Sequence, residues 1–309
     1  TQSRVYLGAS SDLTVARLQA AAVVLAARCG LCVANTGGAQ TDECSDTGPV
    51  PAVKTAQSSP HEELLALKFH FPPLRPDIVR RPHLVERLQQ YVRSPLTVVT
   101  APAGAGKTTL LSEWLAQTSA QSSSGVAWVA LDAGDNDPTR FWRNVSAALE
   151  QAHPGVARHV LTVLQAGYLP STRALITELG NAALTLGEGK ELTLALDDYH
   201  LITVPAILEG MQMLVEQAPP NFHLVVASRS TPAFLHARAL IRGTAHVLGM
   251  RDLRFTVPEQ RVFFSDTHHL TLSAQDHLLL ADTTEGWVAG LQLTALALRQ
   301  HPDRQQYLQ

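Results

Sequence analysis

The stretch TVVTAPAGAGKTTL, residues 97–110, carries residue types that suit the binding of phosphate groups. Two closely spaced glycines, Gly104 and Gly106, would let backbone N–H groups converge on phosphate oxygens. Lys107 adds a positive charge, and the hydroxyl of Thr108 is a ligand that Mg²⁺ accepts. A helix that starts here would also direct the positive end of its dipole at the same anions. We predict a nucleotide-binding loop made of Ala101, Pro102, Ala103, Gly104, Ala105, Gly106, Lys107, Thr108 and Thr109.

Ala101 departs from the usual pattern of such loops, which begin with glycine. The first position makes the turn out of the preceding strand and contributes less to phosphate contact than Gly106 and Lys107. A small residue therefore suffices there. The alternative interpretation is a glycine turn between a strand and a helix that binds no ligand.

The segment LTLALDDYH places two carboxylates, Asp197 and Asp198, at the end of a hydrophobic run. In a parallel sheet the carboxyl end of such a strand lies beside the phosphate loop, where ligands bind. We predict that Asp197 holds Mg²⁺ through water and that Asp198 orients or deprotonates an attacking water. The alternative is an acidic turn without a catalytic role.

The next hydrophobic run, HLVVAS, is followed by Arg229, which we expect at the same edge of the sheet. An arginine there can sense or stabilise a γ-phosphate, although a surface arginine is the alternative. The predicted catalytic residues are thus Lys107, Asp198 and Arg229, and the predicted metal ligands are Thr108 and Asp197. We interpret His200, just beyond the acidic pair, as a structural histidine.

The elements that must position these residues alternate between two patterns. Short apolar runs predict strands, and helical periodicity between them predicts helices such as Lys107–Gln117 and Pro138–Glu150. Alternating elements of this kind indicate a parallel sheet covered by helices on both faces, an α/β P-loop NTPase architecture. The predicted strands are Leu96–Thr100, Val126–Leu131, Leu192–Asp197 and His223–Ser228.

No strand pattern continues after Arg254. Capping-box spacing occurs at Thr256–Glu259 and again at Ser273–Asp276, Gly286 is placed to end a helix, and Trp287–Arg299 has the pattern of a buried helix. We predict an ATP-binding domain over residues 61–250. A small all-helical subdomain, the start of a longer helical region, would follow over residues 251–309.

Residues 1–60 differ in composition from the rest of the 309-residue chain. Residues 35–60 are rich in Gly, Pro, Ser and Thr, which is typical of a flexible linker, so we predict a poorly ordered or atypical extension. The three cysteines, Cys29, Cys32 and Cys44, all lie here, so disulfides cannot staple the main fold and a cytoplasmic location is expected. The apolar segment Leu18–Ala34 contains Arg28 and is too short for a membrane span.

The net charge of −3 excludes the broad basic surface that nucleic-acid-binding domains usually carry. No basic recognition helix follows Trp287 either. These residues are therefore poor candidates for direct DNA contact.

Six segments in order resemble one family, the STAND-class signal-transduction ATPases related to the maltose regulon activator MalT and the large LuxR-type regulators. The resemblance runs from about Leu64 to Gln300, and an alanine or serine at the first loop position is usual in that group. The segments are LLALKFHFPPLRPDIVRRPHLVERL, TAPAGAGKTTLLSEW, VAWVALDAGDNDPTRFW, LALDDYHLI, VVASR and TEGWVAGLQL.

The resemblance implies ATP or ADP with Mg²⁺ as ligands and adds residues to the site. Val79, Arg80 and Arg81 match the family's N-terminal motif, which approaches the adenine, and Trp287 matches a packing landmark of its helical subdomain. In relatives a helical sensor region and a C-terminal helix-turn-helix follow. The resemblance therefore implies DNA contact only through a helix-turn-helix absent from this chain, an unknown small-molecule or protein inducer, and no membrane.

The function expected from this resemblance is a regulatory switch with slow Mg²⁺-dependent ATPase activity, in which the ATP-bound form self-associates and activates. Such a switch requires that ATP and ADP bind two conformations differently. Two alternatives stay open. One is a free-standing P-loop ATPase or phosphotransferase, and the other is a nucleotide-binding scaffold without turnover.

Overall fold

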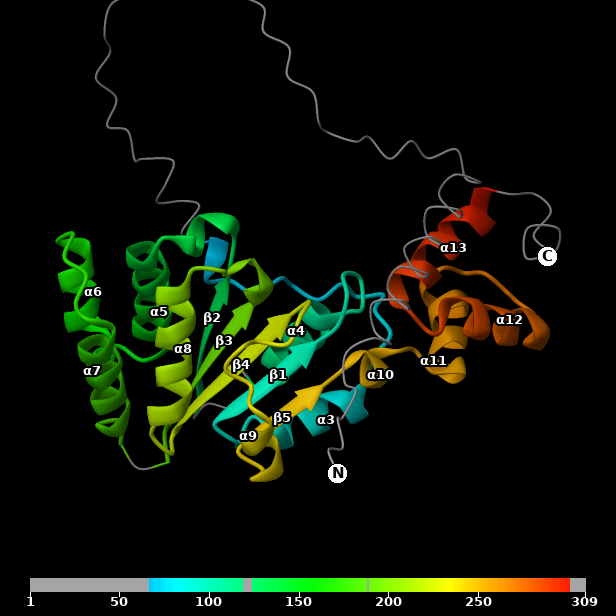
Figure 1. Cartoon of the computed structure of the whole chain (residues 1–309). Coiled ribbons are helices and arrows are strands. Elements are labelled where there is room, and N and C mark those ends of the chain that lie inside the picture. The colour runs from blue at the N-terminus through cyan, green and yellow to red at the C-terminus, as the bar shows by residue number, and fades with distance from the viewer. Residues whose placement is uncertain (1–66, 119–123, 188, 301–309) are drawn as a thin grey trace, which may run out of the picture.

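The computed structural model describes residues 67–118, 124–187 and 189–300 (Figure 1). The predicted N-terminal extension, with its three cysteines, lies outside the described residues. Within them a five-stranded sheet forms in the order β2-β3-β4-β1-β5, and every pair of neighbouring strands is parallel. The predicted α/β P-loop architecture is confirmed. The strands are β1 (Leu96–Thr100), β2 (Ser124–Ala130), β3 (Glu191–Asp197), β4 (Phe222–Ser228) and β5 (Ala245–Leu248).

The sequence prediction located four of these strands to within two residues but missed β5. Strand β5 has only four residues, AHVL, and pairs with β1 alone. Its His246 stacks on Tyr91, with ring centroids 4.3 Å apart and planes at 8°. A short edge strand held by a contact from a distant helix leaves no hydrophobic run for a sequence pattern to detect.

Helices cover both faces of the sheet (Figure 1). The side chains of β3 show why: Leu194 and Leu196 join one buried cluster, whereas Ala195 joins the other. This alternation follows from the two-residue period of a strand. Helices α5 (Pro138–Ala152), α6 (Arg158–Gln165), α7 (Thr172–Leu184) and α8 (Pro205–Gln217) supply the first cluster; α3 (Pro82–Tyr91) and α4 (Lys107–Thr118) supply the second.

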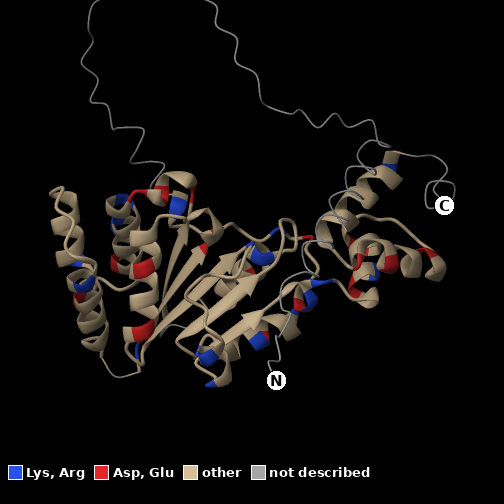
Figure 2. Ribbon diagram, in the orientation of Figure 1, with Lys and Arg blue, Asp and Glu red and all other residues tan. Residues whose placement is uncertain are grey.

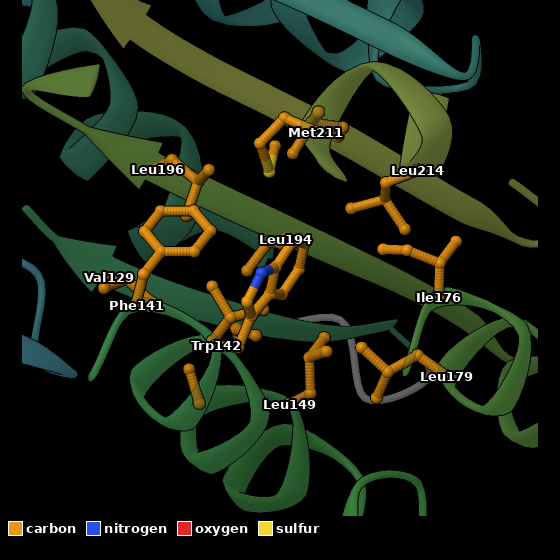
Figure 3. Packing of buried hydrophobic residues seen from close by; sticks show 14 of the residues in the cluster. Val129, Phe141, Trp142, Leu149, Ile176, Leu179, Leu194, Leu196, Met211 and Leu214 are labelled. Carbon is orange, nitrogen blue, oxygen red and sulfur yellow. The ribbon is translucent and has the colours of Figure 1, made fainter. Parts of the chain in front are cut away.

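The larger cluster packs α5, α7 and α8 against the centre of the sheet. In Figure 3, Phe141 and Trp142 of α5 lie against Leu194 and Leu196 of β3, and Met211 approaches from α8. The Phe141 and Trp142 rings meet edge to face at 5.1 Å, a favoured aromatic geometry. As predicted, α5 begins with Pro138, and the Asp137 side chain caps it by accepting a hydrogen bond from the backbone N–H of Arg140 at 2.7 Å.

The segment DAGDND, between β2 and α5, anchors the first described residues of the chain. Asp135 is fully buried and accepts hydrogen bonds from Lys68 Nζ at 2.6 Å and from Asn144 Nδ2 at 2.9 Å. Arg140 lies 3.3 Å from the same carboxylate. Because a buried carboxylate needs such partners, this network holds the chain around Lys68 against the segment between β2 and α5.

A second group of helices follows the sheet: α10 (Met250–Leu253), α11 (Val257–Val262), a π-helical turn (Phe263–Thr267), α12 (Ala274–Thr284) and α13 (Val288–Gln300). Both predicted capping boxes are present, at Thr256–Glu259 and Ser273–Asp276. Gly286, with φ of 72°, follows the end of α12 as predicted. These helices and Val79, from the segment before α3, form a third buried cluster, made of Val79, Phe263, Phe264, Leu270, Leu280, Leu291, Ala295 and Leu298.

Charged residues of both signs are interspersed over the helices and the sheet edges, as Figure 2 shows. None of the helices in the described part of the chain has the length and apolar character needed to cross a bilayer.

Candidate functional site

The loop between β1 and α4 has the backbone of a phosphate cradle. Gly104 and Gly106 adopt φ values of 70° and 86°, which side chains other than glycine rarely allow. A Cβ added at Gly106 would meet nothing within 4 Å, so only the backbone requires glycine there. A Cβ at Gly104 would lie 2.4 Å from the Cβ of Ala289, so glycine is needed there for the close contact as well.

Lys107, the first residue of α4, is buried and folds back over the loop. Its ammonium donates hydrogen bonds to the backbone oxygens of Ala101 at 2.8 Å and Pro102 at 3.0 Å. Burial lowers the pKa of the Lys107 ammonium, and the nearby carboxylates of Asp197 and Asp198 oppose that shift. The loop carbonyls thus hold the ammonium where phosphate oxygens could replace them.

The two predicted metal ligands, 89 positions apart in the sequence, touch each other. Thr108 Oγ1 donates to Asp197 Oδ2 at 2.7 Å, and Asp197 is 4% exposed. Burial raises the pKa of the Asp197 carboxyl, and the hydrogen bond from Thr108 partly offsets this. A hydroxyl and a carboxylate are hard oxygen donors, so this pair fits Mg²⁺, which takes its other ligands from phosphates and water.

Asp198 occupies a left-handed backbone conformation, with φ of 55° and ψ of 33°. Its backbone N–H donates to Asp197 Oδ1 at 2.9 Å, and its side chain is half exposed. Left-handed residues other than glycine are uncommon and concentrate at functional sites. The turn after β3 therefore buries the first carboxylate against the loop and leaves the second open to solvent.

His200 borders this site more closely than the sequence suggested. Its Nδ1 lies 3.7 Å from Asp198 Oδ1, and its side chain is 13% exposed. Burial and the positive charge of Arg229 lower the pKa of His200, while Asp198 opposes the shift. Its proximity to the acidic pair in the sequence was the only available signal.

Arg229 follows the last residue of β4, Ser228, which lies opposite Thr100 of β1. The backbone N–H of Ala101, the first loop residue, donates to the Ser228 oxygen at 3.2 Å. Arg229 is exposed, and its charge contributes to lowering the pKa of Lys107. It thus lies at the predicted edge of the sheet, within electrostatic reach of the loop.

A cavity of about 720 Å³ opens beside the loop and reaches the helical subdomain. Of the predicted binding residues, seven line it: Val79, Arg81, Gly104, Ala105, Gly106, Thr108 and Thr109. The helical subdomain also lines it, through Phe255, Phe263, Thr267, His268, Val288, Ala289 and Gln292. The cavity therefore lies between two parts of the chain, a common position for ligand sites.

The two arginines of the N-terminal motif differ in placement. Arg80 is half exposed, with Nη1 3.7 Å from Glu113 Oε1, and it does not line the cavity. Arg81 is buried: Nε donates to Glu259 Oε1 at 2.7 Å, and Nη1 donates to the Leu253 oxygen at 2.7 Å. The Arg81 guanidinium therefore joins the wall of the cavity to the helical subdomain.

The helical subdomain also bonds directly to the phosphate loop. Trp287 Nε1 donates to the Ala103 oxygen at 2.9 Å, and the Ala289 backbone N–H donates to the Gly104 oxygen at 3.0 Å. Trp287 packs against the core under α3 and α4, in line with its expected packing role. Its bond to a loop 184 positions away had no signal in the sequence.

A parallel sheet with a glycine-rich loop between β1 and α4, and an acidic residue at the end of β3, gives the chain a P-loop NTPase fold of the AAA type. Consistent with this class, residues 90–231 match the family described as AAA domain.

Solved structures that are similar to this chain include the following three. A STAND protein with a tetratricopeptide repeat sensor from Pyrococcus horikoshii has a TM-score of 0.51 at 11% identity, over 78% of this chain and 33% of that one. Cdc6p from Pyrobaculum aerophilum has a TM-score of 0.41 at 16% identity, over 75% and 64% of the two chains. AMPPCP-bound DnaA from Aquifex aeolicus has a TM-score of 0.38 at 12% identity, over 71% and 60%. This chain thus spans about a third of the length of the Pyrococcus horikoshii protein.

Proposed function

We propose that this chain is the ATP-binding switch module of a MalT-like regulator of the LuxR family. In this proposal it binds ATP and ADP with Mg²⁺, hydrolyses ATP slowly, and self-associates in the ATP-bound form. One observation carries the proposal: the loop that would bind phosphate is bonded through Ala103 and Gly104 to the helical subdomain. Phosphate binding and subdomain position thus share one structural element.

The chemistry follows from the residues that surround the loop. The loop N–H groups and Lys107 would bind the β- and γ-phosphates, and Thr108 with Asp197 would hold Mg²⁺. The bound metal would neutralise charge on the phosphate oxygens. Asp198, which is open to solvent, would orient the attacking water or accept its proton, and Arg229 would stabilise charge on the γ-phosphate.

A switch needs a different free energy of nucleotide binding in each arrangement of the chain. Phosphates that draw the loop N–H groups inward also move the Ala103 and Gly104 oxygens on the other side of the same peptides. The bonds from Trp287 and Ala289 then strengthen or break according to how many phosphates are present. The helical subdomain, over residues 251–309, is the moving part in this proposal.

The resemblance to the MalT-related STAND ATPases also underlies several further assignments. The ATP-binding domain comprises residues 61–250, Val79, Arg80 and Arg81 lie near the adenine, and the protein works in the cytoplasm. DNA contact belongs to a separate helix-turn-helix, and a small molecule or protein acts as inducer. The position of Val79 and Arg81 on the cavity wall supports the adenine assignment.

The molecular mass of the chain in solution tests the switch. We expect Mg²⁺ with a slowly hydrolysed ATP analogue to produce a species of at least twice the mass found with ADP, measured by light scattering after size exclusion. Lys107→Ala should abolish this increase, whereas Lys190→Ala, which changes an exposed lysine at the other end of β3, should preserve it. If the chain stays monomeric and releases phosphate rapidly only when a small acceptor is present, the switch proposal is wrong and a phosphotransferase is favoured.

A further inference from the structure

The part of the cavity lining that follows the sheet in the sequence includes three polar residues, Thr267, His268 and Gln292. They come from the helical subdomain, which lies beyond the carboxyl ends of the strands in Figure 1. The same lining includes Val79 and the rings of Phe255 and Phe263, together with charged residues such as Arg75, Asp77 and Arg81. An apolar slot with a few fixed polar groups is what recognition of a flat heteroaromatic ring requires.

We propose that Gln292, oriented by His268, reads the edge of the nucleobase and selects adenine over guanine. This inference rests on the proposed nucleotide site and adds the residues that determine its base specificity. Gln292 is the contacting residue, and His268 is a positioning residue that acts through it.

The imidazole of His268 is held in place from several sides. The side chain is 6% exposed, and its ring packs edge to face against Phe263 at 4.6 Å. Its Nε2 lies 3.1 Å from Gln292 Oε1, while its buried Nδ1 has no partner in the described part of the chain. The Arg299 guanidinium fixes the backbone by donating to the His268 oxygen at 2.8 Å and 3.3 Å.

The backbone around His268 is also unusual. The π-helical turn Phe263–Thr267 precedes it, and His269 after it has φ of 54°. Thr267 Oγ1 donates to the Asp77 oxygen at 2.6 Å, which ties the turn to the segment that carries Val79. Single π-helical turns and left-handed residues are costly and concentrate at functional sites. Here both features direct the chain around the wall of one cavity.

The His268–Gln292 contact fixes which way the amide of Gln292 points. Burial lowers the pKa of His268, which favours the neutral ring, and in a neutral imidazole only one of the two nitrogens carries a proton. With Nε2 as the donor, Gln292 Oε1 accepts the bond and the unpartnered Nδ1 is a lone pair. With the amide reversed, the N–H₂ of Gln292 would face the N–H group at Nε2 of His268. If the proton of His268 moved to Nδ1 instead, the ring would bury an unpaired N–H there.

A fixed amide distinguishes the two purines. Adenine places an amino donor beside a ring acceptor, which matches a glutamine carbonyl beside its N–H₂ group. Guanine places a carbonyl where adenine has the amino group, so two acceptors would meet. Reversal of the amide, which would relieve this clash, is opposed by His268. A bidentate contact of this kind gives discrimination on the order of 10- to 100-fold.

Calorimetric titration of the full chain with ATP, GTP and purine riboside triphosphate, which lacks the 6-amino group, tests the inference. We expect the unmodified chain to bind ATP about 10-fold or more tightly than either of the other nucleotides. Equal affinities for the three would overturn the inference without the need for any variant.

Variants show which side chains produce the preference for ATP over the other two nucleotides. Gln292→Leu should reduce the ATP preference to about 3-fold or less by weakening ATP binding, and His268→Phe, which keeps the ring contact, should reduce it as well. Gln212→Leu is the matched control, because Gln212 is an exposed glutamine of α8 whose side chain donates a hydrogen bond to Glu216. An unchanged preference in folded Gln292→Leu contradicts the inference.

These outcomes distinguish a failure of the base-reading role from a failure of the proposed nucleotide site. If nucleotides bind through Lys107 without preference for a base, the base-reading role is wrong and the nucleotide site stands. If no nucleotide binds, or if Lys107→Ala leaves binding unchanged, both fail.

Discussion

At the scale of single residues, the two neighbouring carboxylates of β3 have different environments and therefore different roles. Asp197 is buried and bonded to Thr108, whereas Asp198 is half exposed and strained into a left-handed conformation. A buried carboxylate beside a hydroxyl suits a metal ion, and an open one suits contact with water. The different roles assigned to Asp197 and Asp198 from the sequence therefore stay a prediction.

We predict that Asp198→Asn slows phosphate release about 100-fold or more and changes the affinity for ATP by less than about 3-fold. Asn tolerates the left-handed backbone, so the loss would be chemical. Release assays and calorimetry check this, with Asp282→Asn on the exposed surface of α12 as control. Equal loss of binding and turnover would instead assign Asp198 to nucleotide binding.

Asp198→Gly extends the test to stability. Because glycine adopts φ of 55° without strain, the free energy of unfolding of this variant should be higher by about 1 kcal/mol, while its activity is lost. Denaturant titration measures this free energy. An unchanged or lower stability would show that the side chain contributes more to folding than its backbone strain costs.

At the scale of elements, the loop and α13 are joined through Gly104. Both loop glycines have positive φ, but only Gly104 lies against Ala289. We predict that Gly106→Ala costs about 1–2 kcal/mol from its backbone alone. Gly104→Ala should cost about 1–3 kcal/mol more, because its Cβ would have to displace α13. Chemical denaturation measures the difference between the two variants, and equal costs would argue against a close contact.

Arg81 and Glu259 join the cavity wall to the helical subdomain across 178 positions of sequence. Burial by itself would raise the pKa of Glu259, but hydrogen bonds from Arg81 and from Thr256 outweigh it and hold that pKa below its ordinary value. The carboxylate therefore stabilises the fold at neutral pH. This stabilisation is lost as the pH falls through the lowered pKa, below about 4.5.

We predict that Glu259→Gln lowers the free energy of unfolding by on the order of 3 kcal/mol at pH 7, because it leaves the Arg81 charge buried without its partner. The difference between the variant and the unmodified chain should shrink as the pH falls toward 3. Denaturation curves at several pH values measure it. A difference that is independent of pH would mean that the pair acts through packing and not through charge.

At the scale of the whole molecule, the sequence predicted the sheet better than the contacts that complete the site. The phosphate loop, Gly104–Thr108, and Asp197 could be found from the sequence, because each lies at or just after the end of a hydrophobic run that predicts a strand. The contacts of Trp287 with Ala103 and of His268 with Gln292 depend on how the helical subdomain packs. Side chains brought together only by packing leave no local pattern in the sequence.

The central claim is that the chain binds ATP with Mg²⁺ through the loop, and the unfolding temperature of the whole molecule tests it most directly. A ligand that binds only the folded state stabilises it by about 2.7 kcal/mol at 100 times its dissociation constant. We predict that Mg²⁺ with ATP raises the unfolding temperature of the unmodified chain and of Lys190→Ala, but not of Lys107→Ala. An equal rise in Lys107→Ala, or no rise in the unmodified chain, would contradict the account.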